Sequence, residues 1–306
     1  MKPHEFDEAS PGESLIDTVE RAASLFDGAA LSYGHGTTNA FDEAAWLVLH
    51  ALQLRPDTDL NLATNLSAEQ QWARALPLLQ QRINTRKPAA YLTQTAWLQG
   101  VAFHADERAI VPRSFIAELL ADGSIDPWLG EHTQRALDLC TGNGSLAVLA
   151  AMAYPDIGLD ACDLSTEALA VAAINVAKHG LQSRIKLLQG DGLQACVSQV
   201  AAHGKYDLIL CNPPYVNAQS MAALPAEYLA EPQMALASGT DGMDFCRSMF
   251  AALPNFLAEH GVLVLEIGNE RVNFEAAFPQ FEPHWLPTSA GDTQVLLLTA
   301  EQLALQ

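Results

Sequence analysis

The chain contains 306 residues, of which 49% are hydrophobic, and this size accommodates one large α/β domain together with a smaller one. Its formal net charge of −20 repels phosphate backbones, which argues against nucleic acid as the main ligand and leaves two interpretations, a basic protein partner or a merely solvated acidic surface. No apolar run reaches the roughly 18–20 residues of a membrane span, and Glu5, Asp7, Glu8 and Glu13 stand where a signal peptide is basic, so we expect a soluble, cytoplasmic protein.

Residues 1–86 are predicted to form an all-helical domain that recognises the substrate. Apolar residues recur at helical spacing in 14–26 and 40–53, and the residues SAEQ at 67–70 predict a capping box that opens a helix over 68–85. Positions 1–60 hold eleven acidic and three basic residues. The domain therefore carries much of the negative charge, either as a docking face or as a solvated one.

Residues 87–113 are predicted to form a hairpin connector. The stretch PAAYLTQTAWLQGVAFHADERAIVP, at 88–112, consists of short alternating runs with aromatic residues and one central glycine. The chain is locally basic only in this region, through Arg82, Arg86, Lys87, Arg108 and Arg113.

Residues 114–306 are predicted to form an α/β domain. Strand-like and helix-like segments alternate, and the strands are almost continuously apolar. This pattern indicates a parallel sheet that is covered by helices on both faces. Ligands bind such sheets outside the carboxyl ends of the strands. We expect helices from about 144, from about 166 with Ser165 as the cap, near 193 and over 241–259. The expected strands are 136–140, 157–162, 185–189, 206–211, 261–268 and 293–299.

Suitable ligand-binding groups follow the first three strands. Residues 141–147, TGNGSLA, fit the G-x-G-x-x-G/A pattern, in which glycines allow a tight turn and backbone N–H groups face a ligand at a helix N-terminus. Asp163 comes 21 residues after Gly142, where such folds place an acceptor for ribose hydroxyls, and Asp191 follows the third strand. Together these groups predict an adenosine-containing cofactor, although each carboxylate has the alternative interpretation of a helix N-terminal acid.

The fourth strand ends in Asn212-Pro213-Pro214-Tyr215. The two prolines have no backbone N–H donor, and their rings fix the conformation of the loop. Asn212 offers a side-chain carbonyl as an acceptor, and Tyr215 offers a flat ring. We therefore expect a rigid pocket that holds a planar –NH2 group. The alternative is that Asn212 is only a turn residue. Because an amide nitrogen is a weak nucleophile, its partner must be strongly electrophilic, as the methyl group of a sulfonium is, and catalysis then depends mainly on positioning. Asn212, Pro213 and Tyr215 are the predicted catalytic residues.

The cysteines give no sign of a metal centre or a redox dithiol. They are odd in number, scattered and mostly within apolar runs, without a C-x-x-C pair, which is typical of reduced, buried thiols. The positions are Cys140, Cys162, Cys196, Cys211 and Cys246.

The motifs LDLCTGNG, DACDLS and NPPYV together resemble the class I (Rossmann-like) S-adenosylmethionine-dependent methyltransferases that act on amino groups. With GVAFHADERAIVPRS at 100–114 and the helical domain, nearly the whole chain is similar to the protein-glutamine N5-methyltransferase family. The resemblance implies that Asn212, Pro213, Pro214 and Tyr215 hold a glutamine side chain, with Phe103 at the same pocket. It implies S-adenosylmethionine bound by Cys140, Thr141, Gly142, Asn143, Gly144, Asp163, Asp191 and Asn212.

Two branches of this family differ in their substrate. Release-factor enzymes usually carry PRPET or PRPDT after the hairpin, whereas this chain carries Pro112-Arg113-Ser114. Several stretches are instead similar to the branch that modifies a glutamine of ribosomal protein L3 (uL3). Ribosomal proteins are basic, so a uL3 substrate agrees with the acidic charge of this chain. We therefore favour the uL3 branch. These stretches are AYLTQTAWLQG, LPAEYLAEPQMALASGTDGMDF, LEIGN and GDTQVLLLTAEQL.

Three alternatives remain beside a release-factor substrate. A methyltransferase for exocyclic amines of DNA or RNA would use the same NPPY chemistry but predicts a basic groove. A dehydrogenase would explain the glycine-rich turn and leave NPPY unexplained. A non-catalytic assembly factor would dock on a basic ribosomal protein through the acidic helices. The sequence does not determine the oligomeric state.

Overall fold

The computed structural model describes residues 14–61 and 65–304, and the chain divides into two compact units. The helical unit combines 1–95 with the short segment 225–230, and the sheet unit contains 96–224 and 231–306. These units differ from the division at 86 and 113 proposed from the sequence, because the hairpin strands belong to the sheet unit and a distant segment joins the helices. Residues 1–13, which carry the four acidic residues of the signal-peptide argument, lie outside the described residues.

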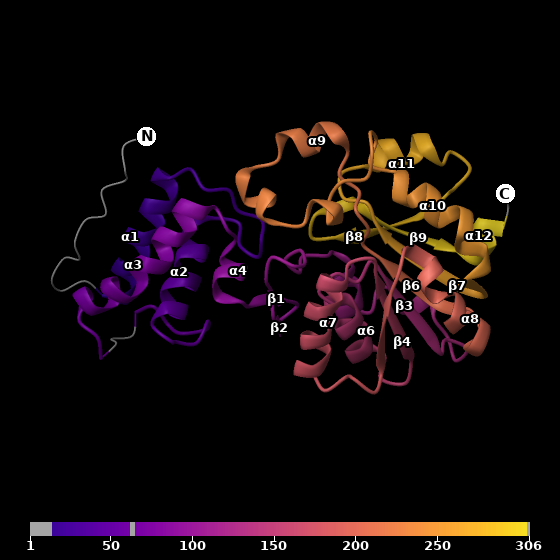
Figure 1. The fold of residues 1–306 in the computed structure, drawn as a ribbon, viewed down its shortest axis with the longest axis horizontal. Helices are drawn as coiled ribbons and strands as arrows, with labels where there is room; N and C mark the ends of the chain where they lie inside the picture. The colour runs from indigo at the N-terminus through magenta and orange to yellow at the C-terminus, as the bar shows by residue number, and fades with distance from the viewer. Residues whose placement is uncertain (1–13, 62–64, 305–306) are drawn as a thin grey trace. The chain divides into compact units, whose positions relative to one another are not determined.

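The helical unit forms around three amphipathic helices, α1 (Leu15–Gly28), α2 (Ala40–Ala51) and α3 (Ala68–Thr85), as the sequence predicts (Figure 1). A short fourth helix, α4 (Ala89–Thr93), follows. The predicted capping box is present, because the Ser67 hydroxyl accepts from the Gln70 N–H and the Gln70 side chain accepts from the Ser67 N–H. The apolar faces meet in one core, which includes Leu15, Val19, Phe26, Leu47, Trp72 and Leu79.

The sheet unit opens with a hairpin and continues as an α/β sheet. Strands β1 (Ala96–Leu98) and β2 (Val101–Phe103) pair antiparallel, as the connector pattern predicts. The main strands are β3 (Arg135–Leu139), β4 (Gly158–Asp163), β5 (Ile185–Gln189), β6 (Tyr206–Cys211), β7 (Leu257–Glu266), β8 (His284–Thr288) and β9 (Gly291–Thr299). The helices are α5 (Ile116–Asp122), α6 (Ser145–Ala153), α7 (Thr166–Lys178), α8 (Val197–His203), α9 (Ala218–Ala223), α10 (Asp244–Ala252), α11 (Arg271–Ala277) and α12 (Ala300–Ala304).

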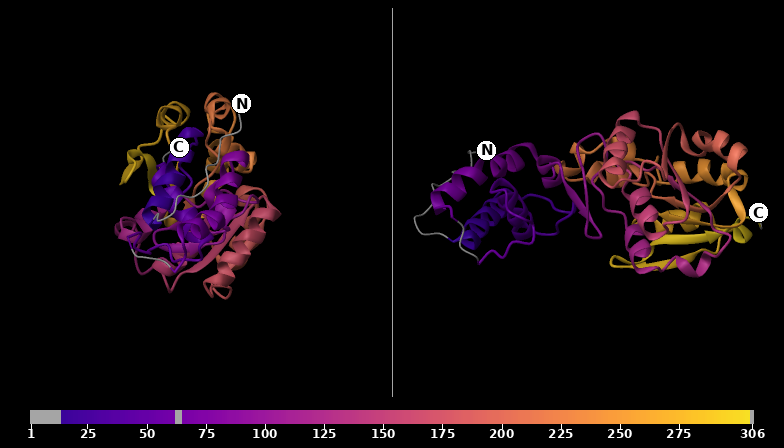
Figure 2. Two further views of the ribbon diagram at one scale, coloured as in Figure 1. Left: turned by 90° about the vertical axis from the view of Figure 1, so that its left-hand side faces the viewer. Right: turned by 90° about the horizontal axis from the view of Figure 1, so that it is seen from below.

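The sheet has the order β5-β4-β3-β6-β7-β9-β8 and is mixed, which corrects the prediction of a parallel sheet. Pairing is parallel from β5 to β7, but β9 runs antiparallel to both β7 and β8. The connection between β8 and β9 is too short for a crossover, so it must be a hairpin, and Figure 2 shows this hairpin in yellow. The helix expected over 241–259 is shorter, because Pro254 ends it and β7 begins at Leu257.

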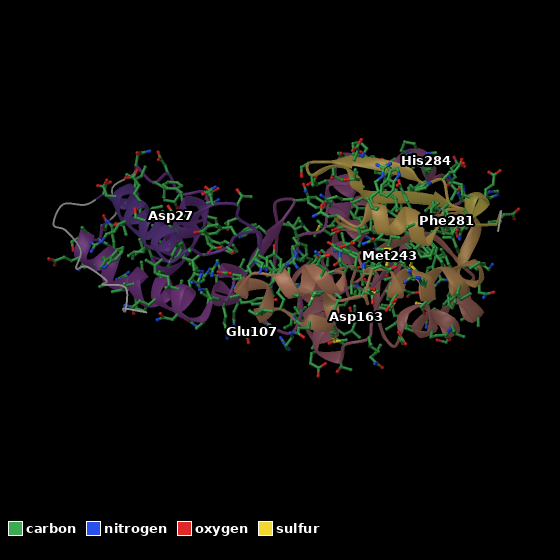
Figure 3. The ribbon with its side chains drawn as sticks, turned by 90° about the horizontal axis from the view of Figure 1, so that it is seen from above. Asp27, Glu107, Asp163, Met243, Phe281 and His284 are labelled. Atoms are coloured by element: carbon green, nitrogen blue, oxygen red, sulfur yellow. The ribbon has the colours of Figure 1, made fainter. Side chains whose placement is uncertain are left out.

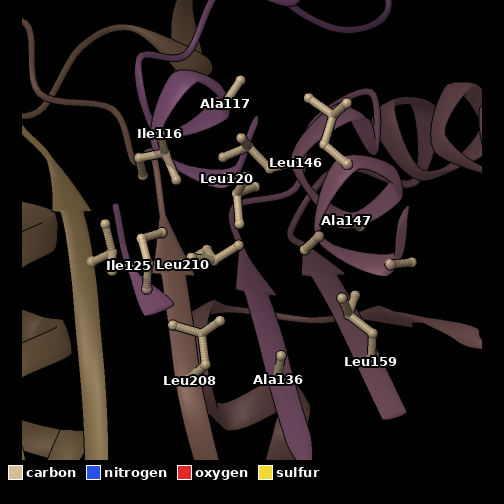
Figure 4. Close-up of a cluster of buried hydrophobic side chains, with 14 of the residues drawn as sticks. Ile116, Ala117, Leu120, Ile125, Ala136, Leu146, Ala147, Leu159, Leu208 and Leu210 are labelled. Atoms are coloured by element: carbon tan, nitrogen blue, oxygen red, sulfur yellow. The ribbon is translucent and has the colours of Figure 1, made fainter. Parts of the chain in front are cut away.

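Two apolar cores cover the two faces of the sheet. Strand β6 shows the alternation, since Leu208 and Leu210 join one core and Ile209 and Cys211 join the other. The first core packs α5 and α6 on the sheet and is drawn in Figure 4. The second packs α10 and α11 through an aromatic cluster that includes Phe250 and Phe274. Packing on both faces holds β3 to β6 in register, so their carboxyl ends form one edge.

Among the described residues, no helix combines the length and the apolar character that a membrane crossing needs.

Candidate functional site

A cavity opens at the carboxyl ends of β3, β4, β5 and β6. Of the residues predicted from the sequence, Cys140, Gly142, Asp163, Asp191, Asn212 and Pro214 line it. Asp163 is labelled in Figure 3. Further lining residues that the sequence did not single out for this role come from the connector loop, from the segment before α10 and from the first turn of α10: Arg108, Ala109, Ile110, Pro232, Met234 and Phe245. Thr141, Asn143, Gly144, Pro213, Tyr215 and Phe103 do not line it.

Asp163 ties the glycine-rich turn to the loop after β4. One carboxylate oxygen accepts from the Gly142 N–H at 2.8 Å and the other from the Ser165 N–H at 2.8 Å. Burial raises the pKa of Asp163, while these N–H donors oppose that shift. Each carboxylate oxygen can accept a second hydrogen bond, so the group can still receive ribose hydroxyls.

The glycines of this turn meet two different demands. Gly142 has φ +54° and no heavy atom within 4 Å of the place where a Cβ would lie, so its backbone faces the open cavity. Gly144, at φ +80°, precedes α6, and a Cβ there would lie 3.0 Å from the Ala172 Cβ. The first glycine lets a ligand approach the backbone, and the second lets α6 pack against α7.

Asp138 supports the glycine-rich turn through hydrogen bonds from within the protein. This role was not predicted from the sequence. The side chain is buried in β3, where Oδ2 accepts from the Thr141 hydroxyl at 2.5 Å and from the Ala147 N–H at 2.9 Å. Burial raises its pKa to about 7. Thr141 therefore shapes the turn from within the protein. The available signal was an acid inside the apolar run ALDLC.

Asn143 and Glu231 hold the connector loop as one wall of the cavity. Asn143 donates from Nδ2 to the Ile110 carbonyl at 2.6 Å. Glu231 accepts from the Val111 N–H at 2.9 Å and forms a two-point ion pair with Arg113 at 2.5 and 2.7 Å. Because Ile110 lines the cavity, both residues position that wall. Glu231 lies in the quoted stretch LPAEYLAEPQMALASGTDGMDF, but its partner was not predictable.

The NPPY loop leaves β6 at Cys211 and turns Asn212 and Pro214 into the cavity. No hydrogen bond links the Asn212 side chain to any described residue, so its amide oxygen can accept from a ligand. Beyond the loop, the Val216 N–H donates to the Leu236 carbonyl at 2.8 Å. This contact brings the cavity-lining segment 232–235 next to the loop.

Tyr215 and Phe103 lie outside the cavity wall. The Tyr215 hydroxyl donates to Glu266 Oε1 at 3.4 Å. Phe103 is fully buried in the core, with its ring 5.4 Å from the ring of His179. The end of β2 therefore contributes a core aromatic, and the role predicted for Phe103 at the substrate pocket finds no support in the described residues.

Within the described parts of the chain, no group of three or more His, Cys, Asp or Glu side chains is arranged to hold a metal ion.

The chain is similar to known proteins over nearly its whole length. Residues 119–243 match the family model described as "Methyltransferase small domain". The chain is 52% identical over 294 residues to a protein of Bordetella pertussis named ribosomal protein uL3 glutamine methyltransferase, covering 95% of this chain and 96% of that one. Proteins with the same name from Burkholderia pseudomallei and Neisseria gonorrhoeae are 50% and 48% identical, covering 96% and 95% of this chain and 97% and 95% of theirs.

Solved structures support the fold alone. The catalytic domain of hMettl16, solved with a MAT2A hairpin, superimposes with a TM-score of 0.51 at 15% identity. That superposition covers 75% of this chain and 79% of the other.

Proposed function

The chain belongs to the ribosomal protein uL3 glutamine methyltransferase family, and from this premise we propose that it transfers a methyl group from S-adenosylmethionine to the side-chain amide nitrogen of a glutamine in uL3. One observation carries the chemistry of the proposal. Asn212 and Pro214 line the same cavity as Gly142, Asp163 and Asp191. The proposed acceptor for the glutamine amide and the proposed acceptors for the nucleoside therefore line the same cavity.

The cavity residues fit the proposed cofactor. We assign Asp163 to accept from ribose hydroxyls and Asp191 from the adenine amino group; this assignment is supported by their position in the cavity lining, together with Cys140 and with Gly142, which has open space beside its backbone. Cys140 adopts φ +62°, a left-handed conformation that a glycine would adopt without strain. S-adenosylmethionine supplies an electrophilic methyl group on its sulfonium.

The protein contributes mainly orientation. The Asn212 amide oxygen accepts an N–H of the glutamine carboxamide, and the neighbouring prolines keep that acceptor in place. Holding two reacting atoms near contact distance lowers a barrier by about 7–11 kcal/mol. The methylated nitrogen is acidic enough to lose its proton to the loop acceptors or to water, so no strong base is assigned.

The charge of the chain supports a basic protein substrate. With a net charge of −20, the surface attracts a basic ribosomal protein and repels bare RNA. A ribosomal-protein substrate agrees with the predicted cytoplasmic location. We keep uL3 as the substrate and a release factor as the comparison for the assay.

The test is to incubate the purified protein and labelled S-adenosylmethionine with uL3, with a release factor or with ribosomal RNA, and to map the methyl group by mass spectrometry. We expect label on a glutamine of uL3. Label on RNA alone, or on the release factor in preference, would contradict the proposal.

A variant pair tests the role of Asn212. Asn212→Ala should reduce turnover at least about a hundredfold, the scale expected when one well-placed polar group is removed, and should change cofactor affinity little. The exposed Asn61→Ala is the matched control and should keep full turnover. If Asn212→Ala turned over like the control, Asn212 would have no part in the mechanism.

A further inference from the structure

Three motifs that the mechanism leaves unexplained meet at Tyr215. They are Pro112-Arg113-Ser114 after the hairpin, LEIGN at the end of β7, and GTDG at 239–242. All of them, and Tyr215 itself, belong to the sheet unit. Their contacts indicate a common role behind the aromatic residue of the NPPY loop.

Glu266 is the centre of this arrangement. Its side chain is 2% exposed, so its carboxylate must be satisfied by protein donors. Oε2 accepts from the Ser114 hydroxyl at 2.6 Å and from the Phe115 N–H at 2.9 Å, and Oε1 accepts from the Tyr215 hydroxyl at 3.4 Å. Ser114 therefore fixes the carboxylate on one side, and the carboxylate fixes the phenol on the other.

Two glycines leave room for the same tyrosine. At Gly268, with φ +53°, a Cβ would lie 2.6 Å from Tyr215 Cε2, so the ring rests directly on this backbone. At Gly242, with φ +80°, a Cβ would lie 2.2 Å from the Tyr215 carbonyl oxygen. Real Cβ atoms do not approach so closely, so both positions require glycine while Tyr215 keeps this orientation.

We propose that Ser114 and Glu266 are positioning residues that act on the methyl-transfer reaction through Tyr215. Glu266 holds the phenol, Ser114 orients Glu266, and Gly268 supports the ring. Pro214 directly precedes Tyr215, the rigid proline pair joins it to Asn212, and both Pro214 and Asn212 line the cavity, so the orientation of the ring sets the orientation of the amide pocket. The kinetic part of this proposal rests on the proposed function, whereas its structural part does not.

The structural part is tested without any substrate. In protein labelled with 3-fluorotyrosine, the 19F resonance that disappears in Tyr215→Phe belongs to Tyr215. We expect this resonance to shift in Ser114→Ala and Glu266→Gln and to return toward its original position in Ser114→Thr, which keeps the hydroxyl. An unchanged resonance in Ser114→Ala would overturn the proposal even if Glu266→Gln failed to fold.

A matched control comes from a second serine–glutamate pair. The exposed Ser289 donates to Glu118 from its hydroxyl at 2.5 Å and from its N–H at 2.8 Å. Ser289→Ala therefore removes the same kind of hydrogen bond at a place outside the cavity lining. It should leave the Tyr215 resonance and the turnover unchanged.

The kinetic part uses methyl transfer to uL3. Ser114→Ala should reduce kcat/KM about tenfold, since a hydrogen bond to a buried carboxyl group is lost, with cofactor affinity within about twofold of the parent. In a Tyr215→Phe background the same substitution should have little further effect, because the phenol through which it acts is already absent. Equal fold-losses in both backgrounds would overturn the relay.

The two proposals fail separately. If the parent protein does not methylate uL3, the proposed function fails, and the 19F measurement still decides whether Ser114 and Glu266 position Tyr215. If uL3 is methylated while the resonance and kcat/KM of Ser114→Ala stay at parent values, the relay alone is refuted.

Discussion

Arg82 is a fully buried cation at the centre of the helical unit. Its Nε donates to Glu43 at 2.6 Å, one terminal nitrogen to Glu227 at 3.3 Å and the other to the Ser32 carbonyl at 3.0 Å. The side chains of Glu43 and Glu227 are 1% and 2% exposed. Arg82→Met preserves the apolar stem and leaves two buried carboxylates without their central partner.

The burial and the remaining hydrogen bonds of Glu43 and Glu227 determine how much stability Arg82→Met should lose. Removing one partner of a buried ion pair costs about 3–5 kcal/mol, because the remaining charge stays desolvated. Glu43 keeps a hydrogen bond from the Thr37 hydroxyl at 3.1 Å, and Glu227 keeps one from the Ser32 N–H at 3.1 Å together with its ion pair to Arg86 at 3.4 Å. These residual donors place the expected loss near the lower end, at about 3 kcal/mol.

The control is Arg55→Met. Arg55 pairs with Asp57 at 2.9 Å, but the two side chains are 84% and 69% exposed, so Arg55→Met should leave the stability of the helical unit close to that of the parent. The assay is native-state hydrogen exchange of α1, α2 and α3, which reports the opening free energy of this unit.

Two further measurements test whether the unpaired buried carboxylates cause the loss of stability. The triple variant with Arg82→Met, Glu43→Gln and Glu227→Gln should regain stability, since no buried carboxylate remains uncompensated, and the partly exposed Arg86 keeps its hydrogen bonds to the Ala29 and Ala30 carbonyls. Burial raises the pKa of Glu43 and Arg82 opposes that shift, so the deficit of Arg82→Met should shrink as the pH falls and Glu43 is protonated. If Arg82→Met lowered the opening free energy no more than Arg55→Met does, the buried ion pairs of Arg82 would not stabilise the helical unit as proposed.

Two other predictions concern the cavity walls. Burial raises the pKa of Asp138 from 3.8 to about 7, so its contribution to stability is full below pH 3.8 and is lost as the pH rises to about 7. Asp138→Asn should remove about 3 kcal/mol of this pH dependence between pH 5 and pH 8, measured by urea unfolding; an equal change in stability between the two pH values in both proteins would contradict it. Glu231→Gln loosens the ion pair with Arg113 and should weaken cofactor binding about tenfold by calorimetry, whereas the exposed Glu259→Gln should bind like the parent.

The sequence determined the features that depend on neighbouring residues. Helical spacing and the Ser67 cap predicted α3 with the bounds that the structure shows. The apolar runs predicted β5 and β6 with correct ends, and parallel strands must deliver Asp163, Asp191 and Asn212 to one edge. Local propensity and strand direction are sufficient for these elements, so Asp163, Asp191 and Asn212 could be named in advance as residues at this edge of the sheet.

Only the tertiary structure decided which distant groups are partners. Ser114 and Glu266 are 152 residues apart, Val111 and Glu231 are 120 apart, and the segment around Glu227 joins the helices of the other unit. A buried carboxylate needs a donor, but no periodicity says which one will reach it. The reversed direction of β9 and the burial of Phe103 have the same origin, because strand pairing and core packing depend on where the chain returns in space.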